Sequence, residues 1–125
     1  MNKYQEFFIS NYIISSKKKR LIYEIDSTKK KRCFIDHFCH DTKKFIISNK
    51  IIYEGELNDS FFIMERVKNE HFFVMSENYI DGITMDYNEL KELLDKDLME
   101  VIAISKKHVI IKEETEKKSN VYILE

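Results

Sequence analysis

Residues 86–113, DYNELKELLDKDLMEVIAISKKHVIIKE, decide the expected fold of this 125-residue chain, because a helix pattern gives way to a strand pattern within them. The leucines of LKELL recur at the three- and four-residue spacing of one helix face. Ahead of them, Asp86 followed three residues later by Glu89 is the pattern of a capping box, which satisfies free N–H groups at a helix start. The sequence therefore predicts a helix over about residues 87–96.

Strand patterns lie on both sides of this helix. Downstream, residues 99–105 and 108–113 are apolar runs joined by a tight Ser-Lys-Lys connection, and 121–124 follows after a polar loop. Upstream, the aromatic and β-branched run at 71–76 and a short segment at 83–85 flank an Asp-Gly turn. We therefore expect these five strands to form a mainly antiparallel sheet.

The N-terminal part of the chain predicts three helices, over about residues 4–14, 17–26 and 29–40, because apolar residues recur there at helical spacing. Serine and threonine pairs at 15–16 and 27–28 are N-cap residue types and are expected to start the second and third helices. Helices that precede strands, with one further helix inserted among the strands, indicate the α+β class.

Short apolar runs between residues 45 and 64 fit either a strand or a helix by periodicity alone. Residues 55–60, GELNDS, are typical of a turn. With 43% hydrophobic and 34% charged residues, the chain has the composition and the length of one folded domain, residues 1–125.

The sequence contains no apolar run of the roughly 18 residues that a membrane-spanning helix needs. Its N-terminus, MNKYQE, lacks the pattern of a signal peptide. We therefore expect a cytoplasmic protein without a membrane partner. In a reducing compartment the two cysteines, Cys33 and Cys39, are expected to remain thiols.

The formal net charge of −1 conceals a strong asymmetry along the chain. Residues 1–50 carry 12 Lys/Arg against 5 Asp/Glu, a net +7, whereas residues 51–125 carry 9 against 17, a net −8. The helical half is therefore basic and the sheet-rich half acidic. Such poles can steer a partner of either sign, or they can pair with each other inside the fold.

One short segment contains every common type of zinc ligand: Cys33, Asp36, His37, Cys39 and His40. On a single helix, Cys33 and His40 are separated by roughly 10 Å along the axis, whereas the ligands of one ion converge within about 4 Å. A catalytic thiol is equally poorly supported, because Cys39 and His40 are adjacent and point to different sides of a helix.

Other catalytic signatures are missing from the sequence. His71 and His108 are the only further histidines, and the two glycines are too isolated to form a phosphate-binding loop. We therefore expect no metal, no cofactor and no catalytic residue in this chain.

The leading hypothesis is a non-enzymatic binding protein whose acidic face engages a basic protein partner. An immunity or inhibitor protein blocks a toxin or nuclease by this logic, with carboxylates placed against a basic surface. The residues expected to bind the partner surround the helix at 87–96. They are Tyr79, Asp81, Asp86, Tyr87, Glu89, Glu92 and Asp95.

The alternative hypothesis is a nucleic-acid-binding protein, because two basic clusters open the second and third expected helices and could pair with phosphates. The clusters are Lys17, Lys18, Lys19 and Arg20, and Lys29, Lys30, Lys31 and Arg32. A lysine-rich composition of the kind that an A+T-rich genome produces would also explain them. A third hypothesis is a homo-oligomer in which the basic and acidic regions meet across an interface.

Overall fold

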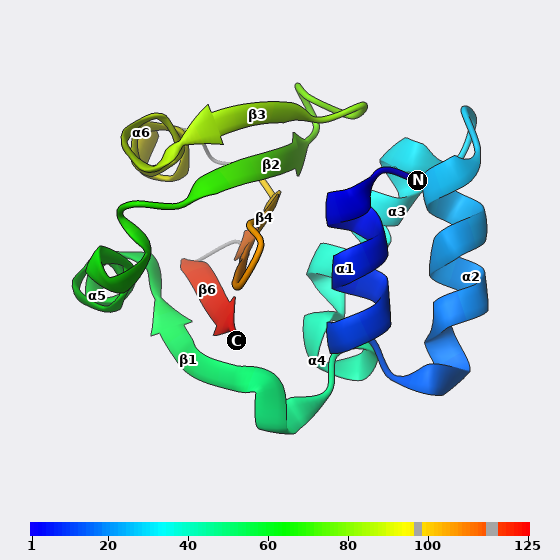
Figure 1. Cartoon of the computed structure of the whole chain (residues 1–125), viewed down its shortest axis with the longest axis horizontal. Helices are drawn as coiled ribbons and strands as arrows, with labels where there is room; N and C mark the ends of the chain where they lie inside the picture. Colours follow the sequence, from blue (N-terminus) through cyan, green and yellow to red (C-terminus); the bar gives the residue numbers. More distant parts are fainter. Residues whose placement is uncertain (97–98, 115–117) are drawn as a thin grey trace.

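The computed structural model describes residues 1–96, 99–114 and 118–125. In this part of the chain, helices cover both faces of one six-stranded antiparallel sheet (Figure 1). The predicted α+β class is therefore confirmed. Among the described residues, no helix is both long and apolar enough to cross a bilayer.

Each pair of neighbouring strands in the sheet is antiparallel, in the order β1-β6-β5-β4-β2-β3. The strands are β1 (Ile51–Glu56), β2 (His71–Ser76), β3 (Ile83–Asp86), β4 (Val101–Ile104), β5 (Val109–Glu114) and β6 (Ser119–Leu124). The last three form a meander at the centre, so β1 and β3 are left as the two edges. Residues 115–117 of the loop expected before the last strand lie outside the described part.

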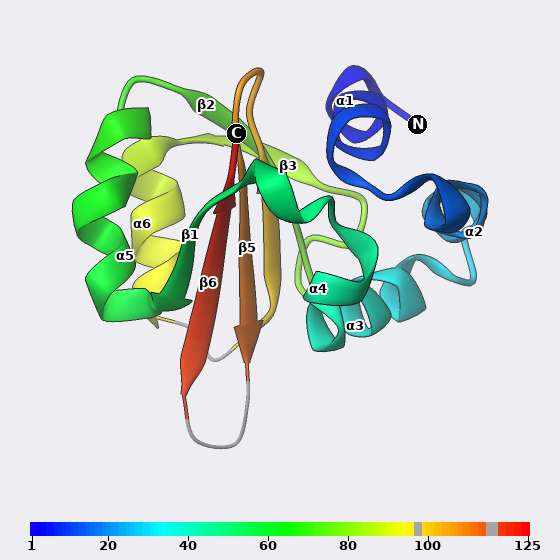
Figure 2. The same cartoon turned by 90° about the horizontal axis from the view of Figure 1, so that it is seen from below.

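The helices form two layers, one on each face of the sheet (Figure 2). The first layer consists of α1 (Lys3–Tyr12), α2 (Ser15–Asp26), α3 (Lys31–His40) and α4 (Thr42–Phe45). The second consists of α5 (Leu57–Met64) and α6 (Tyr87–Lys96). Two 3-10 turns, η1 (Ser48–Lys50) and η2 (Glu65–Val67), precede β1 and follow α5.

Burial on both faces explains why the central strands are continuous apolar runs rather than alternating ones. In β4, Ile102 and Ile104 pack against the α1–α4 layer, while Val101 and Ala103 pack against the α5–α6 layer. Successive side chains of a strand point to opposite faces, so each strand supplies both cores.

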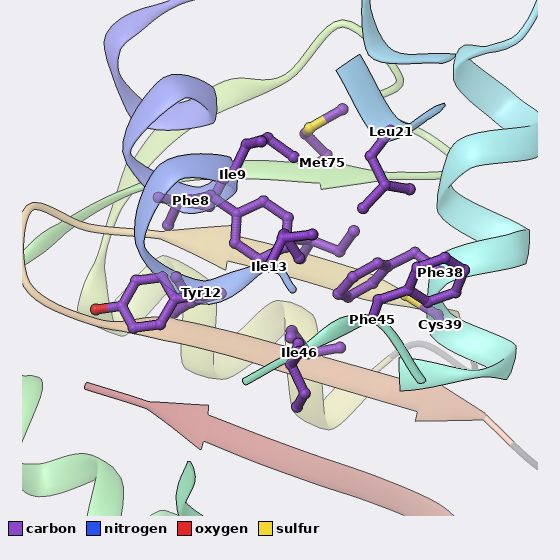
Figure 3. Close-up of a cluster of buried hydrophobic side chains, with 14 of the residues drawn as sticks. Phe8, Ile9, Tyr12, Ile13, Leu21, Phe38, Cys39, Phe45, Ile46 and Met75 are labelled. Atoms are coloured by element: carbon purple, nitrogen blue, oxygen red, sulfur yellow. The ribbon is translucent and has the colours of Figure 1, made fainter. Parts of the chain in front are cut away.

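Phenylalanine rings fill the core beneath the first layer (Figure 3). Phe38 lies at the centre, with its ring centroid 5.4 Å from that of Phe8 and 5.4 Å from that of Phe45. Tilted and edge-on contacts of this kind are the favoured geometries for aromatic pairs. They hold α1, α3 and α4 against one another and against the sheet.

The region from 51 to 64 corrects the sequence analysis, because it forms β1 and α5. The segment at 55–60 is not a turn: Gly55 lies within β1, and residues 57–60 begin α5. A side chain at Gly55 would place its Cβ 2.6 Å from the hydroxyl of Tyr53. The glycine therefore makes room for a neighbouring ring within a strand, which is a different use of glycine from a turn.

The helix starts also differ from the prediction. The serines at 15–16 lie inside α2, whose N-cap is Ile14, and Ser27 is the C-cap of that helix. The third helix begins at Lys31, again without a side-chain cap. The reason for the start of α2 is tertiary: the N–H of Ile14 donates to the carbonyl of Phe45 (2.9 Å), which holds the start of α2 beside the end of α4.

The capping box at α6 is confirmed. The N–H of Glu89 donates to Oδ1 of Asp86 (2.9 Å), and the N–H of Asp86 donates to Oε1 of Glu89 (3.3 Å). This start signal is entirely local, so sequence spacing was sufficient to find it. The strand expected from 99 begins instead at Val101.

Candidate protein-binding surface

The structure divides the predicted partner-binding residues between two places. Asp86, Glu89, Glu92 and Asp95 lie at the start and along the exposed side of α6. Tyr79 and Asp81 lie in the β2–β3 loop, at the opposite end of β3. That strand has four residues, so the two groups stand roughly 10 Å or more apart.

Tyr87 belongs to neither surface, because its side chain is buried in the core beneath α6. Its hydroxyl donates to Oε1 of Glu65 at 3.4 Å. Burial, together with the charge of Glu65, raises the pKa of this phenol. Its contribution is to anchor α6 against η2, which orients the exposed side of the helix.

The β2–β3 loop is occupied by contacts with the basic half of the chain. The ammonium of Lys31 lies 2.6 Å from the carboxylate of Asp81, and Arg32 lies 3.3 Å from Glu77. At the other edge of the sheet, Lys43 of α4 pairs with Glu54 of β1 at 2.7 Å. The opposite charges of the two halves are therefore partly used against each other within the fold.

A groove runs between α5 and α6 on the outer side of the second layer. Its main depression has a volume of about 550 Å³ and is lined by Asn58, Phe61, Asn88, Lys91, Glu92 and Asp95. A second depression of about 270 Å³ shares Asn58 and Asp95 and continues over Glu56 and Lys118. We call these two adjoining depressions the acidic groove.

The lining of the acidic groove holds three carboxylates, Glu56, Glu92 and Asp95, and two lysines, Lys91 and Lys118. Further carboxylates lie on the neighbouring helices and turns: Asp59, Glu65 and Glu89. Lys91 is the cation inside the main depression, and it is already engaged: its ammonium lies 5.5 Å from the Phe61 ring centroid and 3.9 Å from Glu65. The groove therefore presents a surplus of negative charge to solvent.

An exposed aromatic ring stands beside this groove. Phe62 of α5 is 85% exposed, the largest value among the large hydrophobic residues of the described chain. It lies one helical turn after Asn58, so both are on the same side of α5. Ser60 and Met64, by contrast, are buried against the sheet. The ring is thus directed away from the core by the helical phase.

Phe62 could not be identified from the sequence, because residues 61–64 fit a strand or a helix equally well. Once the segment is known to be helical, an advance of 100° per residue places Phe62 about 200° from Ser60, on the opposite side of the helix. The signal was present in the sequence, but it could be used only after the element type was known.

The two basic clusters do not form one surface. Lys17–Arg20 lie in the first half of α2, whereas Lys29–Arg32 lie beyond the other end of that helix, around the start of α3. Several of their side chains are engaged within the fold. Lys17 lies over the ring of Phe45, Lys18 donates to the carbonyl of Ser10, Arg20 pairs with Glu24, and Lys31 and Arg32 pair with the β2–β3 loop.

The cysteines and histidines of α3 are likewise separated. Cys39 is completely buried, and burial raises the pKa of its thiol well above the ordinary range, whereas Cys33 is exposed. His40 lies 3.3 Å from Glu100, whose pKa burial raises to about 7. Across the described residues, no group of three or more His, Cys, Asp or Glu side chains is arranged to hold a metal ion.

A second polar cluster, which the sequence analysis missed, lies at the β4–β5 hairpin. The hydroxyl of Ser105 donates to Glu70, and Nδ1 of His108 lies 2.9 Å from the same carboxylate. On the other side of its ring, His108 faces Glu125 at 3.6 Å. These residues are far apart in the chain, so no spacing pattern connects them before folding.

Comparison of the chain with protein-family models, with curated proteins and with solved structures finds no match. The function is therefore inferred from the geometry of the chain itself.

Proposed function

We propose that this chain is a non-enzymatic binding protein whose acidic groove, together with Phe62, engages a basic segment of a protein partner in the manner of an immunity or inhibitor protein. The observation that carries the proposal is the position of an uncovered phenyl ring beside a concave, carboxylate-rich surface. Either feature alone is ordinary for a protein surface, whereas the two together have the composition of an interface centre and its rim.

Phe62 supplies the apolar part of this interface. Burying a side chain of this size is worth about 1.5–3 kcal/mol relative to leaving it in water. Aromatic residues enclosed by a partner commonly account for a large share of the binding energy at an interface. An exposed phenylalanine brings no benefit to the folding of α5, since its ring has no core contact to make.

The carboxylates supply selectivity for charge. Glu92 and Asp95 lie within the groove, and Glu89 extends the acidic strip toward the start of α6. A negative concave surface attracts a lysine- or arginine-rich segment, raises its association rate and repels acidic competitors. The expected partner segment therefore combines basic side chains with an apolar residue that covers Phe62.

The alternative, a nucleic-acid interface on the basic clusters, has weaker support. Arg20, Lys31 and Arg32 are paired with carboxylates, and the remaining cations stand at two ends of α2. A phosphate backbone would have to compete with these ion pairs and with the nearby acidic loop.

The test begins with capture of the partner from the source cell, followed by titration of the purified partner in a calorimeter. The groove variant Glu92→Lys/Asp95→Lys is expected to weaken binding about 100-fold or more, because attraction becomes repulsion at two sites. Phe62→Ala is expected to weaken it by about tenfold or more. Binding should also weaken as salt concentration rises.

Two matched controls lie in the opposite layer. Tyr23→Ala removes another exposed aromatic ring, 66% exposed on α2, and Glu6→Lys reverses an exposed carboxylate of α1. Both should leave affinity within about twofold of the unmodified protein. A captured partner that is acidic, or one whose affinity ignores the groove variants, would contradict the proposal.

A further inference from the structure

A cavity of about 510 Å³ opens at the end of the sheet where β2 begins and the β4–β5 hairpin turns. It is bounded by η2 and the connection to β2 on one side, by the hairpin on another, and by the start of α1. No described residue lines both this cavity and the acidic groove. It is therefore a separate candidate site, and its argument is independent of the proposed function.

Three cationic side chains line the cavity: Arg66, Lys106 and Lys107. They belong to the half of the chain with a net charge of −8, so the linear charge distribution hides them. Among the described residues, their charged groups form no hydrogen bond or ion pair, whereas Arg20, Lys31 and Arg32 each have a carboxylate within 4 Å. Three cations against one lining carboxylate, Glu70, give this concavity a net positive charge, which favours an anion there.

Glu70 is the carboxylate in the lining of this cavity, and it is committed elsewhere. Its carboxylate accepts a hydrogen bond from the hydroxyl of Ser105 and lies 2.9 Å from Nδ1 of His108. Glu70 is thus hydrogen-bonded to the residues beneath the hairpin rather than to the cations of the cavity. It lies beyond ion-pair distance of the three cations, which leaves them available to an external anion.

The walls of the cavity are held in place. The N–H of Lys107 donates to the hydroxyl oxygen of Ser105 at 3.1 Å. The carbonyl of Lys107 accepts a hydrogen bond from the hydroxyl of Tyr12 at 3.0 Å. On the α1 side, the ring of Tyr4 stacks on Phe73, with centroids 5.8 Å apart. A ligand would therefore order the ends of the cationic side chains but not the backbone, which lowers the entropic cost of binding.

From this arrangement we propose that the cavity binds a small phosphate-bearing ligand. A phosphate monoester is a dianion with several acceptor oxygens, which suits one bidentate guanidinium and two ammonium groups. The volume exceeds that of a phosphate alone and is within the range of small-molecule sites, so it accommodates the group to which the phosphate is attached. Asn69, in the same lining, offers a side-chain amide to that group.

The test is calorimetric titration of the full chain with inorganic phosphate and, separately, with adenosine monophosphate. We expect saturable binding, weakened about tenfold by either Arg66→Gln or Lys106→Gln and further by the double variant, since each removes a charge-assisted contact. Equal affinity for the two probes would assign the site to the phosphate group itself. Tighter binding of the nucleotide would show that the attached group also occupies the cavity.

The control variant is Lys19→Gln/Lys30→Gln, which removes two exposed lysines outside the cavity whose ammonium groups form no contact among the described residues. It should bind both probes as the unmodified chain does. The proposal is overturned if neither probe saturates the protein below about 10 mM, or if the control weakens binding as much as the cavity variants do. Binding of oligonucleotides alone, without either small probe, would overturn it as well.

Discussion

The two helical layers use the same kinds of side chain in opposite ways. In the α1–α4 layer, Phe8, Phe34, Phe38 and Phe45 are buried, and several cations are paired with carboxylates. In the α5–α6 layer, Phe62 faces solvent and carboxylates surround a groove. Both layers therefore bury a core against the sheet. The second layer also leaves an aromatic ring and a carboxylate-lined groove exposed on its outer side.

The largest expected difference between the layers concerns phenylalanine. Phe38→Ala should lower the free energy of unfolding by about 3–5 kcal/mol, because it leaves a cavity among the rings of the first layer. Phe62→Ala should change it by less than about 0.5 kcal/mol, because the ring has little to lose on truncation. Urea unfolding followed by circular dichroism measures both. Similar costs for the two variants would remove the distinction between the layers.

A medium effect is expected at the one buried lysine of the described sheet. Lys112 is 1% exposed on the α5–α6 face, where its ammonium donates to the carbonyl of Leu94 (2.8 Å) and lies 3.0 Å from Glu114. A cation at this position satisfies the C-terminal end of α6. Lys112→Met should therefore cost about 1–3 kcal/mol of unfolding free energy, since both partners lose their donor.

Lys91→Met is the matched control for this change. Lys91 lies on the outer side of the same layer, where its ammonium makes two solvated contacts, 3.9 Å from Glu65 and 5.5 Å from the Phe61 ring centroid. Its replacement should cost less than about 0.5 kcal/mol in the same urea experiment. If Lys112→Met were as mild as the control, the buried ammonium would not be what secures the end of α6.

The smallest expected effect is a dependence of stability on pH, centred on Glu100, which precedes β4 and faces His40 of α3. Burial raises the pKa of Glu100 from 4.5 to about 7, with Asp36, Glu77 and Glu114 adding to the rise and His40 opposing it. The folded state therefore holds this proton more tightly than the unfolded state does. Stability should fall as pH rises from about 4.5 to about 7, by about 1 kcal/mol for this partly solvated group.

His40 changes stability in the same direction. A hydrogen bond to the carbonyl of Asp36, followed by the charge of Glu100, raises the pKa of His40, so its stabilising contribution is lost as pH rises through that pKa. Unfolding measured at several pH values should show the decline, and Glu100→Gln should flatten it. A Glu100→Gln protein with an unchanged pH profile would assign the dependence to another group.

Local patterns explain which elements were predictable. The α6 start depends on two side chains three residues apart, and the central strands are apolar enough to be buried in any arrangement. In contrast, β1 is an edge strand, and it exists because it pairs with β6, more than 60 residues further along the chain. No short-range pattern indicates a partner strand so far along the chain. Whether residues 51–64 form strand or helix was therefore ambiguous until the sheet was known.

The candidate sites also contain some contacts that sequence spacing predicts and others that only folding creates. Sequence spacing brought Glu89, Glu92 and Asp95 together correctly, since they share one helix. It could not place Asp81 beside Lys31, nor gather Arg66 and Lys106 around one cavity, because those contacts join segments that only folding brings together. The acidic character of residues 51–125 was evident from the sequence, but the cavity lined by Arg66, Lys106 and Lys107 was not.

By itself, the sequence determined the α+β class, the α6 helix and the charge of each half, because these follow from residue type and from spacing within a few positions. Only the tertiary structure decided that Tyr87 is buried, that Phe62 is exposed and that three cations meet at one end of the sheet. These properties depend on helical phase and on strand pairing over long separations. The elements packed around a side chain decide whether it is buried or exposed, and short-range sequence patterns do not predict those elements.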